Sequence, residues 1–311
     1  MTGSALTVVV ESPEPSALRP FWQRVLGYEV DGDSLVDPLQ RDPAFRFVQS
    51  DELRPLRHRV HVDVVRPASV VEGLGLGEPS GPYGVRHADA DGNEVDMVPG
   101  DPLGDTDATA DWQAVFAAMA CYRTTTPEQQ RDLVAAATSL AADVDFPLRV
   151  DVGPGLVVLD SGKDMAEPDA HGLDLDFTDL AARVQAAARD LGAVPDSTLP
   201  RFVQLFLDAA DVDAVRAFWL AALHYVPDRR DIPDLHDPRR ADPVLVFQQL
   251  DLADTARREQ RNRIFFELAL PADFVQPRLD AALSAGGRLL SESDGRWHVT
   301  DPEGNELVYV S

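Results

Sequence analysis

The sequence has a single cysteine and no long apolar run, and each shortage excludes a class of protein. With Cys121 alone, the chain can form neither an internal disulfide nor a metal cluster built on cysteine thiolates. No stretch reaches the roughly 20 apolar residues of a membrane-spanning helix, and the apolar run at residues 5–10 is too short for a secretory signal. We therefore expect a cytoplasmic protein with no membrane partner.

Basic residues are scarce relative to acidic ones. The 311 residues include 28 lysines and arginines against 53 aspartates and glutamates, which gives a formal net charge of −25, and the only lysine is Lys163. Because nucleic-acid binding needs a basic surface against the phosphates, this balance argues against a nucleic-acid partner, while it permits a cationic ligand. An apolar fraction of 44% in a chain of this length predicts two or three folded domains.

The most informative feature that is present is a long internal repeat. Residues 11–28 (ESPEPSALRPFWQRVLGY) match 208–225 (DAADVDAVRAFWLAALHY), and residues 89–98 (DADGNEVDMV) match 301–310 (DPEGNELVYV). The shared order and the shared turn residues predict two copies of one domain. The segment between the copies lacks the repeat. We divide the chain accordingly into three domains, at 1–102, 103–198 and 199–311.

Each copy reads as a strand, a helix and further strands, twice over. In the first copy, a strand at 5–11 precedes an amphipathic helix that Gly27 ends. A second strand at 59–65 precedes a short helix at 68–74, and the turn at 91–93 joins the closing strands. The second copy follows the same order, and the Phe-Trp pair of each first helix is expected to pack on a sheet.

The middle segment has a pattern of its own. A helix is expected to start after Thr126, a hairpin to occupy 148–159, and a second amphipathic helix to span 177–191. The alanine-rich stretch 116–122 (FAAMACY) reads as helical. We expect its Cys121 to be a small buried apolar residue.

Short phrases in the two copies carry a family likeness: FWQRVLGY, HRVHVDV and ADGNEV in the first, and FWLAALHY, VLVFQQL, RNRIFFEL and DPEGNEL in the second. They resemble the vicinal oxygen chelate superfamily, and in particular its glyoxalase-like and bleomycin resistance-like domains. The resemblance implies an α+β fold in which paired βαβββ modules form a curved sheet around a ligand cavity. Two such domains would flank a small α+β middle domain. The superfamily includes metal-dependent lyases, dioxygenases and drug-sequestering proteins.

The middle segment resembles a second family, pterin-4a-carbinolamine dehydratase. The similar stretches are 133–152, 155–159 and 172–192. That family has a His-His-Pro stretch after its first helix, where this chain has Asp145 and Phe146 before the proline. Both catalytic imidazoles are missing, which argues against dehydratase activity.

The superfamily resemblance also implies positions for metal ligands, on the first strand of each module and near the end of its last strand. Carried over one at a time, these positions fall in the first copy on Thr7, His61, Asp96 and Gln49, and in the second copy on Gln204, Gln249, Phe265 and Val308. Phenylalanine and valine offer no lone pair to a cation. The second set is therefore expected to line a pocket for an organic ligand, with Glu267 among its ligand-binding residues.

Alternation along the strands groups the polar residues of the first copy. His61 and Asp63 share one face of their strand, and Glu94 and Asp96 share one face of a neighbouring strand. One imidazole with two carboxylates can hold a divalent ion, so we expect His61 and Asp96 as metal ligands beside Asp63. In the alternative, Asp63 and Glu94 lie in water at strand edges, and His61 is a hydrogen-bonded wall residue.

The first strand adds Thr7 and Glu11, which share a face of their own. If this face lines the same cavity, Glu11, Glu94 or Gln49 completes the ligand set. A neighbouring carboxylate, Glu94 or Glu11, would then move a proton in catalysis.

Three functions remain open at this point, besides a role as a scaffold or in protein interaction. The first is a protein that binds a small organic molecule in a sheet-lined cavity and sequesters a drug or metabolite. The second is a metal-dependent enzyme of the lyase or oxygenase type, in which an ion at His61 acts as a Lewis acid. The third is a pterin dehydratase of the middle domain, which the missing imidazoles disfavour. The two copies are expected to pack as an intramolecular pseudo-dimer, or the chain to form a homodimer.

Overall fold

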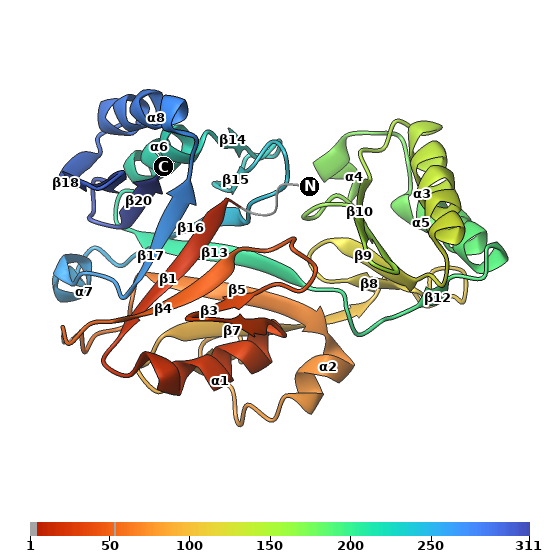
Figure 1. Cartoon of the computed structure of the whole chain (residues 1–311), viewed down its shortest axis with the longest axis horizontal. Coiled ribbons are helices and arrows are strands. Elements are labelled where there is room, and N and C mark those ends of the chain that lie inside the picture. Colours follow the sequence, from red (N-terminus) through yellow and green to blue (C-terminus); the bar gives the residue numbers. More distant parts are fainter. Residues whose placement is uncertain (1–4, 53) are drawn as a thin grey trace. The chain divides into compact units, whose positions relative to one another are not determined.

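The computed structural model describes residues 5–52 and 54–311, and the chain forms two compact units (Figure 1). The first unit contains the chain up to Asp63 together with Glu78–Asp96 and Val203–Ser311. The second contains Val64–Gly77 and Met97–Phe202. Helices and strands are mixed in both units, which confirms the expected α+β class.

An eight-stranded sheet in the first unit takes one module from each copy of the repeat. Its central strand β1 (Leu6–Ser12) pairs in parallel with β4 (Ala44–Gln49) of the same copy and antiparallel with β17 (Ile264–Ala269) of the other copy. Beyond β4 follow β3 (Ser34–Val36) and β2 (Glu29–Asp31), and beyond β17 follow β20 (Glu306–Val310), β19 (Arg296–Thr300) and β18 (Arg288–Ser293). Figure 1 shows β1 and β17 side by side.

The two remaining modules meet in the same way. Strand β5 (Val60–Pro67) lies between β7 (Glu94–Pro102) of its own copy and β13 (Phe202–Ala209) of the other copy. Beyond β13 follow β16 (Val244–Gln249), β15 (Leu235–His236) and β14 (Val226–Pro227), and β6 (Arg86–Ala88) pairs with β7. The copies thus exchange modules. Neither 1–102 nor 199–311 forms a sheet from its own modules alone.

Helices α1 (Pro15–Leu26) and α6 (Val212–Leu223) carry the repeated Phe-Trp pair, and α7 (Thr255–Glu259) and α8 (Ala272–Ser284) complete the first unit. Trp22 and Trp219 are fully buried, as expected for packing residues. Their indole N–H groups donate to Asp89 over 2.8 Å and to Asp301 over 3.0 Å, respectively. The repeated Asp-x-x-Gly-Asn turn therefore fixes each helix to the closing strand of a module.

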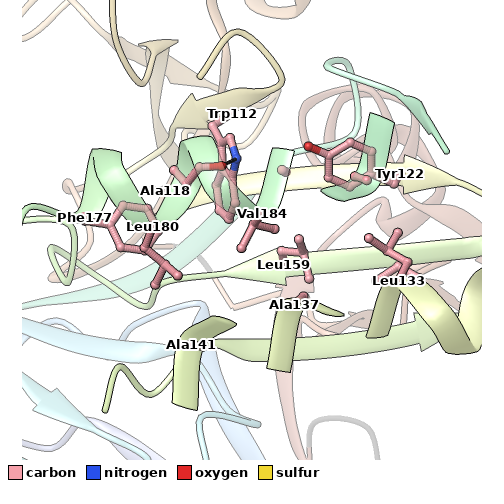
Figure 2. Packing of buried hydrophobic residues seen from close by; sticks show 14 of the residues in the cluster. Trp112, Ala118, Tyr122, Leu133, Ala137, Ala141, Leu159, Phe177, Leu180 and Val184 are labelled. Carbon is pink, nitrogen blue, oxygen red and sulfur yellow. Dashed lines mark hydrogen bonds between the residues drawn. The ribbon is translucent and has the colours of Figure 1, made fainter. Parts of the chain in front are cut away.

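The second unit packs two long helices on a small sheet. Its elements are α2 (Ala68–Gly73), β8 (Trp112–Ala114), β9 (Ala118–Arg123), α3 (Pro127–Ala142), β10 (Arg149–Gly153), β11 (Leu156–Asp160), α4 (Pro168–His171), α5 (Phe177–Asp190) and β12 (Val194–Pro195). The sheet order is β10-β11-β9-β8, with β12 beside β9, and β8 pairs with the end of β7. Figure 2 shows side chains of both helices and the sheet, among them Leu133, Leu159 and Val184, meeting in one core.

Three predictions for this unit, a helix cap, a hairpin and a buried cysteine, are confirmed, and one is wrong. Thr126 caps α3 by accepting from the backbone N–H of Gln129 over 3.1 Å, and the hairpin is present as β10 and β11. The stretch 116–122, expected to be helical, instead contains most of strand β9. A strand buried on both faces is a nearly continuous apolar run, which periodicity cannot distinguish from a buried helix. Cys121 is buried there, as expected.

Phe146, which the predicted resemblance to the dehydratase family aligns with a catalytic imidazole, is a core residue of this unit. It is 4% exposed, and its ring centroid lies 4.9 Å from that of Phe177. Within the described part of the chain, no helix is both long and apolar enough to cross a membrane.

Candidate metal centre

His61, Asp63 and Asp96 converge on strands β5 and β7 of the first unit. One potential ligand atom of each residue lies within 4.8 Å of those of the other two. The side chains are 4%, 8% and 13% exposed, respectively. His61 and Asp63 share a face of β5 because side chains alternate along a strand, and β7, which carries Asp96, is the neighbouring strand. The three residues grouped from the sequence therefore offer one imidazole and two carboxylates to a common point.

The His61 imidazole is neutral at physiological pH. Burial, reinforced by the positive charges of Arg57 and Arg86, lowers the pKa of His61 to about 3. Its ring stacks on Phe206, with centroids 4.8 Å apart and planes inclined by 21°. The Nδ1 atom is buried and has no hydrogen-bond partner among the described residues. A neutral imidazole keeps a lone pair on one of its two ring nitrogens, which suits a buried histidine to a metal ion.

Gln204, on strand β13 of the other copy, joins the same group. Its Nε2 donates to Oδ2 of Asp63 over 3.0 Å. Its Oε1 is buried and, within the part of the chain that the structure describes, accepts no hydrogen bond. A buried polar atom without a partner is costly, and the amide that carries this oxygen is held on Asp63 through its Nε2. The donor set of one imidazole nitrogen and two carboxylates fits a divalent cation.

Arginines surround the carboxylates next to this set. Oε2 of Glu94 accepts from Nε of Arg57 over 2.7 Å and lies 3.3 Å from Nε of Arg86. Nε of Arg86 also donates to Oδ1 of Asp96 over 3.2 Å. Further out, Asp208 pairs with Arg257. Glu94 is 15% exposed and is held by two guanidinium groups. It does not lie in water at a strand edge, as one alternative expected.

Three residues that were grouped with His61 lie elsewhere. Thr7 and Glu11 are on β1, and Gln49 is on β4, in the eight-stranded sheet. The structure does not bring them to His61, because the first module of each copy pairs with the second module of the other copy.

Glu11 has an environment of its own. It forms ion pairs with Arg54 and, over 2.9 Å, with Arg261. Glu11 is therefore neither a ligand of the His61 set nor a base beside it.

The glutamines at equivalent positions have one structural contact in common. Nε2 of Gln49 donates to the carbonyl oxygen of Pro13 over 2.8 Å, and Nε2 of Gln249 donates to that of Ala210 over 2.9 Å. Each amide thus ties the end of its strand to the segment that follows the first strand of its module. This shared role accounts for the retention of glutamine in both copies.

Paired charges lie in the sheet next to Phe265 and Val308, where a ligand pocket was expected. Glu267, directly opposite Thr7 in the sheet register, forms ion pairs with Arg46 and Arg296. The equivalent sheet positions at the His61 site hold Asp63 and Gln204, which belong to the candidate metal site.

Glu306, the counterpart of Glu94, lies beside Val308. It accepts from Nε2 of His298 over 2.7 Å and pairs with Arg261. Although burial opposes the shift, these hydrogen bonds and charges lower the pKa of Glu306 to about 2. No group of metal-ligating side chains other than the His61 set is present in the described ranges.

Three residues at this site were not predicted from the sequence: Arg57, Arg86 and Phe206. A signal for Arg57 existed in the repeat itself, because Arg57 precedes His61 by the interval at which Arg261 precedes Phe265. Both arginines reach an equivalent glutamate, Glu94 and Glu306. Arg86 and Phe206 had no such signal, since their relation to His61 arises only from strand pairing.

The glyoxalase-like domain family matches residues 7–98 and 204–310. These segments make up well over half of the chain, and the chain therefore belongs to the glyoxalase-like domain family. The match leaves the segment between them uncovered, so the resemblance of the middle segment to pterin dehydratase stays a prediction.

Solved structures with some similarity to this chain include two glyoxalase-type proteins. A glyoxalase-related enzyme from Fulvimarina pelagi is 20% identical over 33% of this chain and 82% of its own, with a TM-score of 0.26. A glyoxalase/bleomycin resistance protein from Albidiferax ferrireducens T118 is 14% identical over 33% and 92%, with a TM-score of 0.24. The cppA protein from Streptococcus pneumoniae TIGR4 is 10% identical over 99% and 98%, with a TM-score of 0.40. No curated protein matches significantly.

Proposed function

We propose that this glyoxalase-like protein binds a divalent cation at His61, Asp63 and Asp96, and a small organic molecule through oxygen atoms at the same place. The convergence of one imidazole and two carboxylates within 4.8 Å carries the proposal. The buried, unpartnered Oε1 of Gln204 supports it, because this atom can serve as a further ligand. When bound, the ion would act as a Lewis acid on the oxygens of the organic ligand.

Each residue of the candidate site has a distinct part in this proposal. His61 offers a neutral ring nitrogen at physiological pH because its pKa is lowered to about 3, and Phe206 fixes the orientation of the ring by stacking on it. Asp63 and Asp96 supply negative charge, and Gln204 holds Asp63 in place through its Nε2. Such supporting hydrogen bonds orient ligands and raise affinity at metal sites.

Turnover would also require a group that accepts a proton. Glu94 lies two residues from Asp96 on the same face of β7, and it is the carboxylate that we propose for this role. Glu11 does not fit the role of proton acceptor, because its strand β1 belongs to the other sheet. The Phe265 and Val308 pocket is the weaker candidate for the ligand, since ion pairs of Glu267 fill the adjacent wall.

Metal content is the direct test. The protein is stripped with a chelator, dialysed against Zn²⁺ or Mn²⁺ and assayed by elemental analysis, and calorimetric titration gives the affinity. We expect about one equivalent in the wild type, and less than about a tenth of an equivalent in His61→Ala. His298→Ala is the matched control, because this histidine lies beside Val308 in the other sheet. Equal metal content in wild type and His61→Ala would overturn the proposed site.

Ligand binding is tested on the same preparations. The thermal midpoint of apo and metal-loaded protein is compared in a screen of small hydroxy and keto compounds, since a ligand of the native state raises the midpoint. A shift that requires both the metal and His61 supports the proposal. A shift of equal size in apo protein and in His61→Ala would assign the ligand to a site without metal, as in simple sequestration.

A further inference from the structure

Arg86 is a cationic group that hydrogen-bonds a candidate metal ligand, Asp96. It opens strand β6, directly opposite Asp96 in the antiparallel register with β7. Its Nε donates to Oδ1 of Asp96 over 3.2 Å and lies 3.3 Å from Oε2 of Glu94. The side chain is 17% exposed, so this contact is partly shielded from water. The guanidinium thus neutralises the carboxylate charge of Asp96 that would otherwise attract a bound cation.

Contacts of this kind oppose cation binding in two ways. A guanidinium a few ångströms from a divalent ion repels it, and the repulsion is much larger in a partly buried site than in water. The hydrogen bond to Asp96 must also weaken when the carboxylate turns its lone pairs to a metal. Removal of Arg86 should therefore strengthen cation binding, whereas a residue that only supports the fold would weaken binding when removed.

The other sheet provides an internal comparison. The position equivalent to Asp96 holds Val308, and the residue opposite Val308 is His298 rather than an arginine. His298 contacts only the glutamate of this pair, through Nε2 and Oε2 of Glu306 at 2.7 Å. The arginine therefore occurs in the sheet that has the ligating carboxylate, and it is replaced where that carboxylate is absent.

The segment that precedes Arg86 is shaped to accommodate its guanidinium. Gly81 has a φ of +79°, and a Cβ there would lie 3.3 Å from Cζ of Arg86. Ser80 pairs with Arg86 through two backbone hydrogen bonds of 2.8 and 3.1 Å. The arginine is thus held by its own loop as well as by Asp96.

We propose that Arg86 acts as an internal counter-ion that competes with the metal for Asp96 and so sets the cation affinity of the site. The proposal rests on the proposed metal site and adds its regulation. In this view the site stays weak toward cations while Arg86 is seated on Asp96, and it tightens when Arg86 moves away.

The test is the Zn²⁺ and Mn²⁺ affinity of Arg86→Gln at constant pH and salt, measured by calorimetric titration of the full chain. We expect binding tighter than in the wild type by about tenfold or more. Arg57→Gln is the matched control, since Arg57 contacts Glu94 but no candidate ligand, and we expect a smaller gain there. Asp96→Asn should abolish the gain in a double variant with Arg86→Gln.

Hydrogen exchange on the wild type gives an independent readout that does not depend on the variant folding. Saturating Zn²⁺ should raise exchange in residues 80–88, because the seat of Arg86 on Asp96 is lost. Weaker or unchanged affinity in Arg86→Gln, an equal gain in Arg57→Gln, or unchanged exchange in this segment would each overturn the counter-ion role.

The outcomes separate this inference from the proposed function. Metal binding by the wild type with no gain in Arg86→Gln leaves the site standing and removes the role of Arg86. Binding that is detectable only in Arg86→Gln supports both. Failure of both proteins to bind either metal removes both.

Discussion

The buried pair of Trp219 and Asp301 allows a stability prediction that can be worked out bond by bond. Both residues are fully buried. Oδ1 of Asp301 accepts from the backbone N–H groups of Glu303 and Asn305, each over 2.9 Å. Oδ2 accepts from Nδ2 of Asn305 over 2.6 Å and from the indole N–H of Trp219 over 3.0 Å. Four donors therefore converge on one carboxylate.

The substitution Asp301→Asn changes half of this arrangement. The amide oxygen can keep the two backbone bonds, but its NH₂ group then faces two donors, which leaves both without an acceptor. A buried donor left unsatisfied costs about 1–3 kcal/mol. Burial raises the pKa of Asp301, so the asparagine is spared part of the desolvation cost of the carboxylate. For the two donors together this gives about 2–6 kcal/mol, and we therefore expect a loss near the lower end of that range, about 2–3 kcal/mol.

The companion variant Trp219→Phe removes one donor and leaves the carboxylate bonded to Asn305. It should cost about 1–3 kcal/mol for a hydrogen bond to a charged group, plus a packing term. In the Asp301→Asn background the same substitution removes a donor that is already unsatisfied, so it should cost about 1 kcal/mol less than in the wild type. Chemical denaturation followed by circular dichroism measures the four proteins of the cycle.

A coupling energy indistinguishable from zero would refute this reasoning, because it would show that the indole and the carboxylate act independently. The first copy supplies an internal replicate. Trp22 donates to Asp89 over 2.8 Å, and Asp89 also accepts from Nδ2 of Asn93 over 2.8 Å. A cycle at Trp22 and Asp89 should give a coupling of the same sign.

Two further predictions concern pH and packing. Burial, with the charges of Arg263 and Arg54, lowers the pKa of His58 to about 4. Below about pH 6.5 the unfolded chain therefore binds a proton at this residue that the folded chain does not bind. The free energy of unfolding should fall by about 2 kcal/mol between pH 7.5 and pH 5 because of His58. His58→Gln should flatten that part of the stability profile, and an identical profile in both proteins would contradict the assignment. At Gly287 a Cβ would lie 2.5 Å from the Phe218 ring and 2.8 Å from the carbonyl oxygen of Ala282, so Gly287→Ala should destabilise by about 1–3 kcal/mol. Thermal denaturation that leaves the midpoint unchanged would exclude this crowding.

The elements and the central part of the site could be predicted from the sequence because both depend on local spacing. Alternation along β5 and β7 was enough to place His61 with Asp63 and Glu94 with Asp96 on common faces. Turn residues were enough to locate the hairpin of the middle segment. The buried strand β9 was not recognisable, since apolar residues on both faces carry no period.

The exchange of modules could not be predicted from the sequence. For the same reason, the residues that lie next to His61 across the strand pairing could not be predicted either. Strands β1 and β13 carry the same kind of apolar sequence in the two copies, so either could pair with β5 as far as local pattern shows. The choice depends on long-range pairing, which is why Gln204 lies at the His61 site and Thr7 does not. Arg86 and Phe206 were missed for the same reason.

Exchange of modules also constrains how the two halves of this gene can change. His61, Asp63 and Asp96 all come from the first repeat, but Gln204, which donates to Asp63, comes from the second, so neither repeat alone encodes the whole arrangement. A recombination event that removes or replaces one repeat would leave half of each sheet without its neighbour, and it would separate Gln204 from Asp63. Natural variation at these two positions should therefore be correlated across the length of the chain, as it would be between the subunits of an obligate dimer.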